Sequence, residues 1–130
     1  MQELFHNNRR VFGAIRSQVV THRDGEEIAP GVTAKSTPGH SIGHTSYLVQ
    51  SGGERLFLCQ DVFNHPFISV YNPGWRLMFD QDPEMAEKTR RQMLEWLATE
   101  KIPVQAFHFP FPGHARIEKD GGGYRWVPLS

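Results

Sequence analysis

The stretch TPGHSIGH, residues 37–44, combines two histidines with one proline and two glycines. Residues 32–37 alternate in polarity with period two, which is typical of a strand, so the histidines are expected in a loop at a strand end. Proline and glycine disfavour a regular helix there, and His40 and His44 therefore need not point the same way despite their four-residue spacing. Loops held on a sheet scaffold are common places for functional sites.

Two further polar side chains are also expected at the ends of predicted strands. Asp61 follows the predicted strand 55–59, and His108 ends the predicted strand 104–108. Imidazole and carboxylate are ligands that divalent metals accept, whereas the single Cys59 excludes a cluster of thiolate ligands. The residues alone leave two interpretations open, a metal site or ordinary loop residues that hydrogen-bond locally.

The other elements follow from hydrophobic periodicity and from turn residues. Asp82 suits a helix N-cap and Pro83 the first helical position, which makes the helix that they begin the clearest one. No repeat or linker argues for a second domain, so residues 1–130 are interpreted as a single domain. The expected elements are a helix over 2–19, strands over 19–21, 32–37, 45–50, 55–59 and 104–108, a loop over 62–80, a helix over 83–100, and a hairpin of 115–119 and 124–127.

Composition restricts the classes of partner. The 130 residues include 14 Lys and Arg against 14 Asp and Glu, so the chain lacks the positive charge expected of a nucleic-acid or anionic-membrane binder. No apolar run approaches the ~20 residues that a spanning helix needs. One cysteine cannot form an internal disulfide, which favours a reducing, cytoplasmic location.

Three motifs together carry a family resemblance: TPGHSIGHT at 37–45, the strand-ending Asp61, and HFPFPG at 108–113. In this order they resemble the C-terminal half of the metallo-β-lactamase-fold hydrolases, over about residues 26–129. The resemblance is closest to the branch of lactonases, glyoxalase-II-like thioesterases and organophosphate hydrolases. It implies an α+β fold that forms half of an αββα sandwich, with a mostly antiparallel sheet and outer helices.

The resemblance also implies roles for individual residues. His40 would bind one metal, Asp61 would bridge two metals and help hold a metal-bound water, and His108 would bind the second metal. His44 would support these ligands. The implied cofactor is zinc, one or two ions, with iron or manganese as alternatives, and the implied reaction is hydrolysis of an ester, lactone, thioester or phosphoester.

A pocket for the small-molecule substrate is expected beside these ligands. For its aromatic members, ordinary core packing is an equally good interpretation. The candidate pocket residues are Phe63, His65, Phe67, Phe109, Phe111 and His114.

The sequence departs from the family pattern in three places. Ser41 and Ile42 replace a common Thr-Pro pair, and Gln60 stands where the family usually has glycine. The motif His-x-His-x-Asp-His, which supplies the remaining ligands from the N-terminal half, is absent from these 130 residues. We therefore expect a partial domain, incomplete or weakly active alone, and whether it is itself an enzyme stays open.

A solitary half of such a sandwich would expose an apolar sheet face, which predicts association. A homodimer that buries sheet on sheet is the favoured assembly, and a missing N-terminal half is the competing account. The alternative function is a non-catalytic metal-binding or dimerising half-domain.

Overall fold

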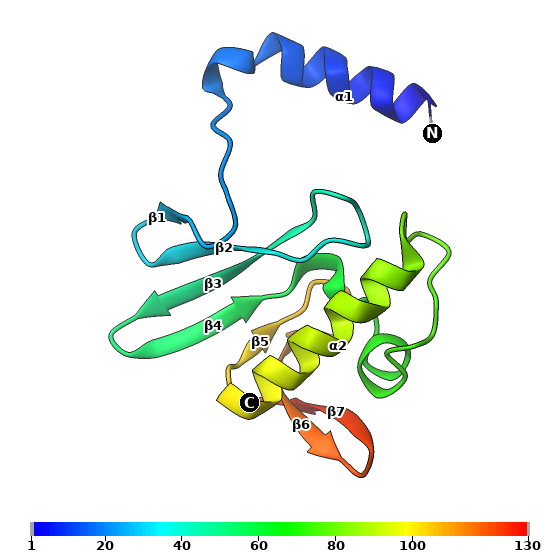
Figure 1. Ribbon diagram of the computed structural model, residues 1–130. Coiled ribbons are helices and arrows are strands. Elements are labelled where there is room, and N and C mark those ends of the chain that lie inside the picture. Colours follow the sequence, from blue (N-terminus) through cyan, green and yellow to red (C-terminus); the bar gives the residue numbers. More distant parts are fainter. Residues whose placement is uncertain (1, 130) are drawn as a thin grey trace.

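Seven strands form one sheet, and their order in the sheet is their order along the chain (Figure 1). The structure is a computed structural model and describes residues 2–129. Strands β4 and β5 are parallel and all other neighbours are antiparallel. The elements are α1 Gln2–Ala14, η1 Arg16–Gln18, β1 Glu27–Ala29, β2 Val32–Ser36, β3 Thr45–Ser51, β4 Glu54–Leu58, η2 Gln60–Val62, η3 Pro66–Tyr71, α2 Pro83–Glu100, β5 Val104–Gln105, β6 His114–Asp120 and β7 Gly123–Pro128.

Most predicted elements are confirmed, including the mostly antiparallel sheet, both hairpins and the helix that begins at Pro83. The strand predicted over 19–21 is wrong, because these residues find no partner strand. The strand predicted over 104–108 is only two residues long, since the chain turns after Gln105. Strand β1 was not predicted, because its three exposed residues hold too little periodicity, and the expected loop 62–80 contains the helical turn η3.

Helix α2 packs on one face of the sheet, where Figure 1 shows it crossing the strands. The Asp82 carboxylate caps it by accepting a hydrogen bond from the Met85 N–H at 2.9 Å, and Pro83 occupies the first turn. Its last turn ends at Lys101, which adopts a left-handed conformation. The buried residues of α2 recur at helical spacing: Ala86, Thr89, Arg90, Met93, Leu94 and Leu97.

The hydrophobic core lies between α2 and the sheet. In β4, Phe57 points into it and is fully buried, as are Val104 and Leu94. Cys59 is also fully buried, and burial raises the pKa of its thiol to about 12. The core residues are Phe57, Cys59, Val62, Phe63, Val70, Met93, Leu94, Leu97, Ile102, Val104, Ala106, Phe109 and Ile117.

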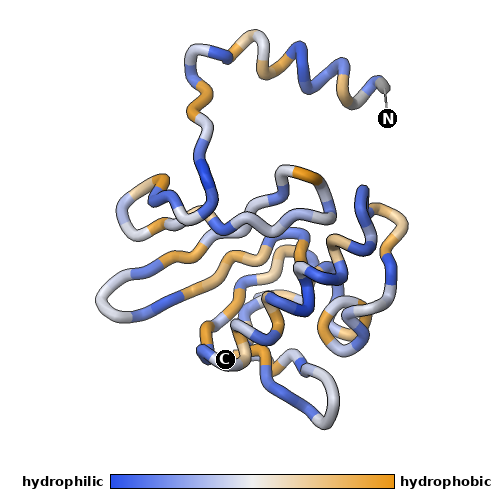
Figure 2. Tube along the Cα trace, in the orientation of Figure 1, coloured by the Kyte–Doolittle hydropathy of each residue, from blue (hydrophilic) through white to orange (hydrophobic). Residues whose placement is uncertain are grey.

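The opposite face of the sheet carries apolar side chains that are only half-buried. Because side chains alternate along a strand, the neighbours of Phe57 in β4 point away from α2. These outward residues pair across the sheet with outward residues of β3, and Figure 2 shows apolar stretches along these strands. We call this surface the open face, and its members are Val32, Tyr47, Val49, Leu56 and Leu58.

Helix α1 stands away from the sheet at the end of an extended segment (Figure 1). Its side chains Phe5, Val11 and Phe12 are exposed, as is Ile15 just after it. The predicted helix over 2–19 is thus confirmed up to Ala14, but these four apolar side chains are not buried against the rest of the described chain. No helix within residues 2–129 has the length and apolar character needed to cross a membrane.

Gln60, the first residue of the short helix η2 that follows β4, has a φ of +50°. This left-handed conformation is costly for a residue with a Cβ and free for glycine, the residue that the family resemblance led us to expect at this position. The turn is kept despite the side chain, and it places Asp61 at the end of the sheet.

Single replacements of Phe57 and of its neighbour Leu56 by alanine should show which face of the sheet is buried in the core and which is the open face. We expect Phe57→Ala to lower the free energy of unfolding by about 3–5 kcal/mol, because it opens a cavity in the core. Leu56→Ala removes a half-buried side chain from the open face, so the expected loss is about 1 kcal/mol. Urea unfolding of both variants at low protein concentration measures the difference, and equal losses would contradict the assignment of faces.

Substitution at Gln60 should report the strain of its left-handed backbone. We expect Gln60→Gly to leave the free energy of unfolding unchanged or raise it by up to about 1 kcal/mol. Gln60→Val should lower it by about 1–2 kcal/mol, because a β-branched side chain tolerates positive φ poorly. Thermal unfolding of the two variants is the measurement, and the opposite order would show that the turn is not left-handed in solution.

Candidate metal site

The structure brings His40, Asp61 and His108 together, although they lie on three separate loops. His108 Nε2 lies 2.8 Å from Asp61 Oδ1, and His40 Nε2 lies 3.8 Å from Asp61 Oδ2. The two histidines thus face different oxygens of one carboxylate. All three side chains are partly exposed, which leaves them accessible to a ligand from solution.

The loop that carries His40 is fixed to the start of α2. The backbone N–H groups of residues 81–82 donate hydrogen bonds to the carbonyls of His40 and Gly39, at 3.1 and 3.0 Å. The Thr89 hydroxyl donates to the Pro38 carbonyl at 2.6 Å. These contacts hold the backbone of residues 38–40, from which the His40 ring projects.

Gly39 allows this loop to approach the helix closely. Its φ is +134°, and a Cβ at this position would lie 2.3 Å from the Cα of Ala86. Any other residue would therefore clash with the helix backbone. The glycine noted in the sequence is required by this contact rather than by general flexibility.

A buried ion pair stands behind His40. His40 Nδ1 lies 3.1 Å from Asp80 Oδ1, and the other oxygen of Asp80 accepts a hydrogen bond from Arg90 Nη2 at 3.1 Å. The side chains of Asp80 and Arg90 are 1% and 2% exposed, so both are shielded from water. Arg90 also donates to the carbonyls of Val62 and Pro73, at 3.1 and 2.9 Å.

Sequence reasoning missed Asp80 and Arg90. Asp80 lies in a segment that was interpreted as an irregular loop, and its contact with His40 joins residues 40 positions apart. One signal was present in the sequence, because Arg90 falls between Ala86 and Met93 on the buried stripe of α2. A cation on such a stripe needs a buried partner.

His44 supports Asp61 from the backbone side. Its Nε2 accepts a hydrogen bond from the Asp61 N–H at 3.1 Å, so its Nδ1 must carry the proton in the neutral ring. That Nδ1–H donates to the Thr37 carbonyl at 3.0 Å. Burial lowers the pKa of His44, and the neutral ring is the form that accepts from Asp61.

The aromatic residues expected in a substrate pocket are dispersed. Phe63 is fully buried and Phe109 is 7% exposed, and both belong to the core between α2 and the sheet. Phe67 stacks on Tyr71 at a ring distance of 5.4 Å, whereas Phe111 is 99% exposed. Phe63 and Phe109 therefore take part in core packing, and a substrate pocket beside the proposed ligands stays a prediction.

The two remaining pocket candidates are histidines with local roles. His65 accepts a hydrogen bond from the Phe67 N–H at 3.2 Å and so caps the turn η3. His114 begins β6 and pairs with Gln105 of β5. Among the described residues, neither forms a hydrogen bond or ion pair with His40, Asp61 or His108.

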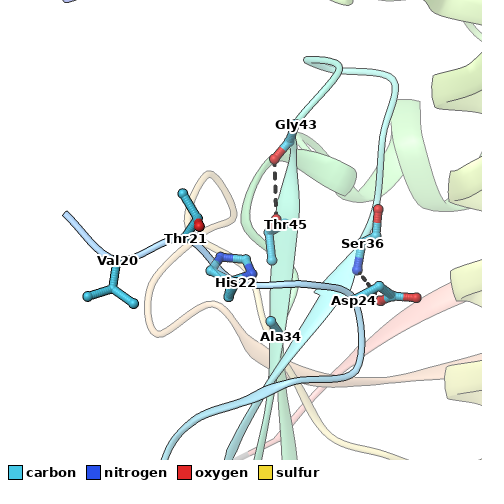
Figure 3. A pocket seen from close by; sticks show the side chains of 8 residues that line it. All are labelled: Val20, Thr21, His22, Asp24, Ala34, Ser36, Gly43 and Thr45. Carbon is cyan, nitrogen blue, oxygen red and sulfur yellow. Dashed lines mark hydrogen bonds between the residues drawn. The ribbon is translucent and has the colours of Figure 1, made fainter. Parts of the chain in front are cut away.

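A hollow beside β2 and β3 lies away from the predicted ligands (Figure 3). It has a volume of about 440 Å³ and lies where the segment before β1 crosses β2 and β3. No predicted ligand lines it. Its lining residues are Val20, Thr21, His22, Asp24, Ala34, Ser36, Gly43 and Thr45.

The donor set at Asp61 fits a divalent metal by its chemistry. Within residues 2–129, no group of three or more His, Cys, Asp or Glu side chains is already arranged to hold a metal ion. Two imidazole nitrogens and one carboxylate nevertheless meet at this point, and these donors suit zinc or iron. His40 also has a carboxylate on its second nitrogen, a pairing that is usual for metal-binding histidines.

Comparison with solved structures places this fold among hydrolases. AidC, a dizinc quorum-quenching lactonase in complex with a product, N-hexanoyl-L-homoserine, superposes with a TM-score of 0.87 at 25% identity. The match covers 94% of this chain and 42% of AidC. AbOPH, a hydrolase in the β-lactamase superfamily, superposes with a TM-score of 0.84 at 26% identity. That match covers 94% of this chain and 43% of AbOPH.

An N-acyl homoserine lactone hydrolase with N-hexanoyl-L-homoserine bound at its catalytic metal centre also matches, with a TM-score of 0.56 at 25% identity. That match covers 68% of this chain and 34% of the hydrolase. No protein-family model matches the chain, and no curated protein is significantly similar to it. The chain spans less than half the length of these structures. Its fold is therefore that of metallo-β-lactamase superfamily hydrolases, and the share of these structures that it covers is consistent with the predicted C-terminal half of their domain.

Proposed function

We propose that this chain supplies the metal-binding C-terminal half of a hydrolase that opens lactones or related esters. The observation that carries the proposal is the meeting of His40 and His108 on separate oxygens of Asp61. The likeness to a dizinc lactonase and to an N-acyl homoserine lactone hydrolase supports the reaction class.

His40, Asp61 and His108 are the proposed ligands, and zinc is the proposed metal. A divalent metal, when bound there, supplies a Lewis acid that polarises the carbonyl of an ester and activates water. The chain itself contributes the orientation of the donors. Asp61 presents both oxygens, and His44 holds its backbone N–H so that the carboxylate keeps its direction.

The proposed substrate class is an N-acyl lactone, by likeness to the structures that hold homoserine products. The loop beside His108 offers apolar surface for such an acyl chain, because Phe107 is 80% and Phe111 99% exposed. Both aromatic rings lie within three residues of a proposed ligand along the chain.

A second sheet is the proposed cover of the open face. Half-buried apolar side chains of β2, β3 and β4 form a surface that water solvates poorly. A second copy of this chain or a complementary N-terminal half would bury it, and either would add groups beside Asp61. The single, fully buried Cys59 supports a cytoplasmic setting.

One observation favours a second candidate function. No three-ligand group is already arranged around a common centre within the described residues. Fewer than three arranged ligands suit a half-domain that dimerises, or binds a metal only weakly, without catalysis. Metal binding and turnover, measured separately, distinguish the two functions.

Removal of a proposed ligand should weaken metal binding. We expect the purified chain to retain zinc after equilibrium dialysis, and His40→Ala or Asp61→Ala to weaken its zinc affinity at least about tenfold, because too few donors remain. Elemental analysis of the dialysed proteins measures the content. The matched control is His6→Ala, since His6 lies on the exposed helix α1; equal zinc in wild type and His40→Ala would refute the assigned site.

Lactone opening should depend on Asp61. We expect zinc-loaded wild type to open N-hexanoyl-homoserine lactone slowly, because the remaining ligands of the family lie outside this chain. Asp61→Asn should lower the rate at least about tenfold, equivalent to about 1.4 kcal/mol in the barrier. A pH-indicator assay follows ring opening. Zinc binding without any Asp61-dependent turnover would favour the non-catalytic function.

A further inference from the structure

We propose that Asp80 and Arg90 are positioning residues that fix the tautomer of His40, so that its Nε2 presents a lone pair toward Asp61. The role of this lone pair in metal binding rests on the function proposed above. The tautomer itself does not, because it follows from contacts between Asp80, Arg90 and His40 alone.

The first step concerns the His40 ring. Its Nδ1 lies 3.1 Å from Asp80 Oδ1, which is hydrogen-bonding distance. An ionised carboxylate can only accept, so Nδ1 must carry the proton. In the neutral ring the proton is then absent from Nε2, the atom that faces Asp61 at 3.8 Å. That distance is too long for a hydrogen bond. The Nε2 lone pair of His40 and the Asp61 carboxylate are both electron-rich, and a cation placed between them would be attracted to both.

The second step concerns the direction of the Asp80 carboxylate. Arg90 Nη2 donates to Asp80 Oδ2, and the Val62 and Pro73 carbonyls hold the rest of the guanidinium. Arg90 has donors only and cannot exchange roles with its partner. The carboxylate therefore keeps Oδ2 on Arg90 and Oδ1 on His40.

The third step is a comparison with His44. That ring is fixed with its proton on Nδ1 by a different acceptor, the Thr37 carbonyl, and its Nε2 accepts from the backbone of Asp61. Both histidines of the loop thus turn Nε2 toward Asp61. Only His40 owes this to a buried charged pair, which makes its tautomer sensitive to a single atom change in Asp80.

Asp80→Asn provides the test, because it keeps the shape of the side chain. Arg90 can only donate, so the amide oxygen must accept from Arg90 and the amide NH₂ must face His40 Nδ1. That nitrogen then becomes an acceptor, and the proton moves to Nε2. Long-range ¹H–¹⁵N spectra at alkaline pH, where imidazole is neutral, report the tautomer directly.

We expect the proton of His40 on Nδ1 in wild type and on Nε2 in Asp80→Asn, with zinc affinity lowered about 10–100-fold in the variant. Asp120→Asn, in the exposed hairpin between β6 and β7, is the matched control and should change neither readout. A merely structural role of Asp80 would not invert the tautomer.

The wild-type spectrum keeps the proposal falsifiable even where Asp80→Asn does not fold. A wild-type His40 protonated on Nε2, or on both nitrogens at alkaline pH, would overturn the positioning role. A wild type with the proton on Nδ1 that binds no zinc would support the positioning role and overturn the proposed metal-dependent function. Each of the two proposals can therefore be refuted without refuting the other.

Discussion

The buried ion pair of Arg90 with Asp80 is the interaction on which the candidate site depends. Arg90 joins helix α2 to the loop that follows Asp61, because it donates to carbonyls of that loop as well as to Asp80. Burial of two charges is costly unless their hydrogen bonds are satisfied, and here carbonyls and the carboxylate satisfy them. The site at His40 is therefore tied to the core rather than to the surface.

The parts of this structure that could be predicted are those set by local chemistry. The turn residues Ser51 to Gly53 predicted one hairpin, and Asp82 with Pro83 predicted the start of α2. The meeting of His40, Asp61 and His108 was expected from their places at strand ends and from the family resemblance. The role of the left-handed turn before Asp61 became clear only with the backbone in place.

The remaining features depend on contacts between distant residues. Residues 19–21 have strand-forming side chains, but a strand needs a hydrogen-bonded partner, and these residues cross β2 and β3 without pairing with them. Phe63 and Phe109 fit a core or a ligand pocket equally well by composition, and packing under α2 decides for the core. Asp80 could not be linked to His40, because hydrogen bonds across 40 residues leave no periodic signal.

Cys59 lies two residues before Asp61, yet its sulfur points into the core and is fully buried. Burial keeps this thiol protonated over the ordinary pH range. A thiolate would attract thiophilic ions such as Cu(I), whereas nitrogen and oxygen donors alone do not select them. If His40, Asp61 and His108 hold a metal as proposed, the inward direction of the Cys59 side chain leaves that metal with nitrogen and oxygen donors and no sulfur ligand from this position.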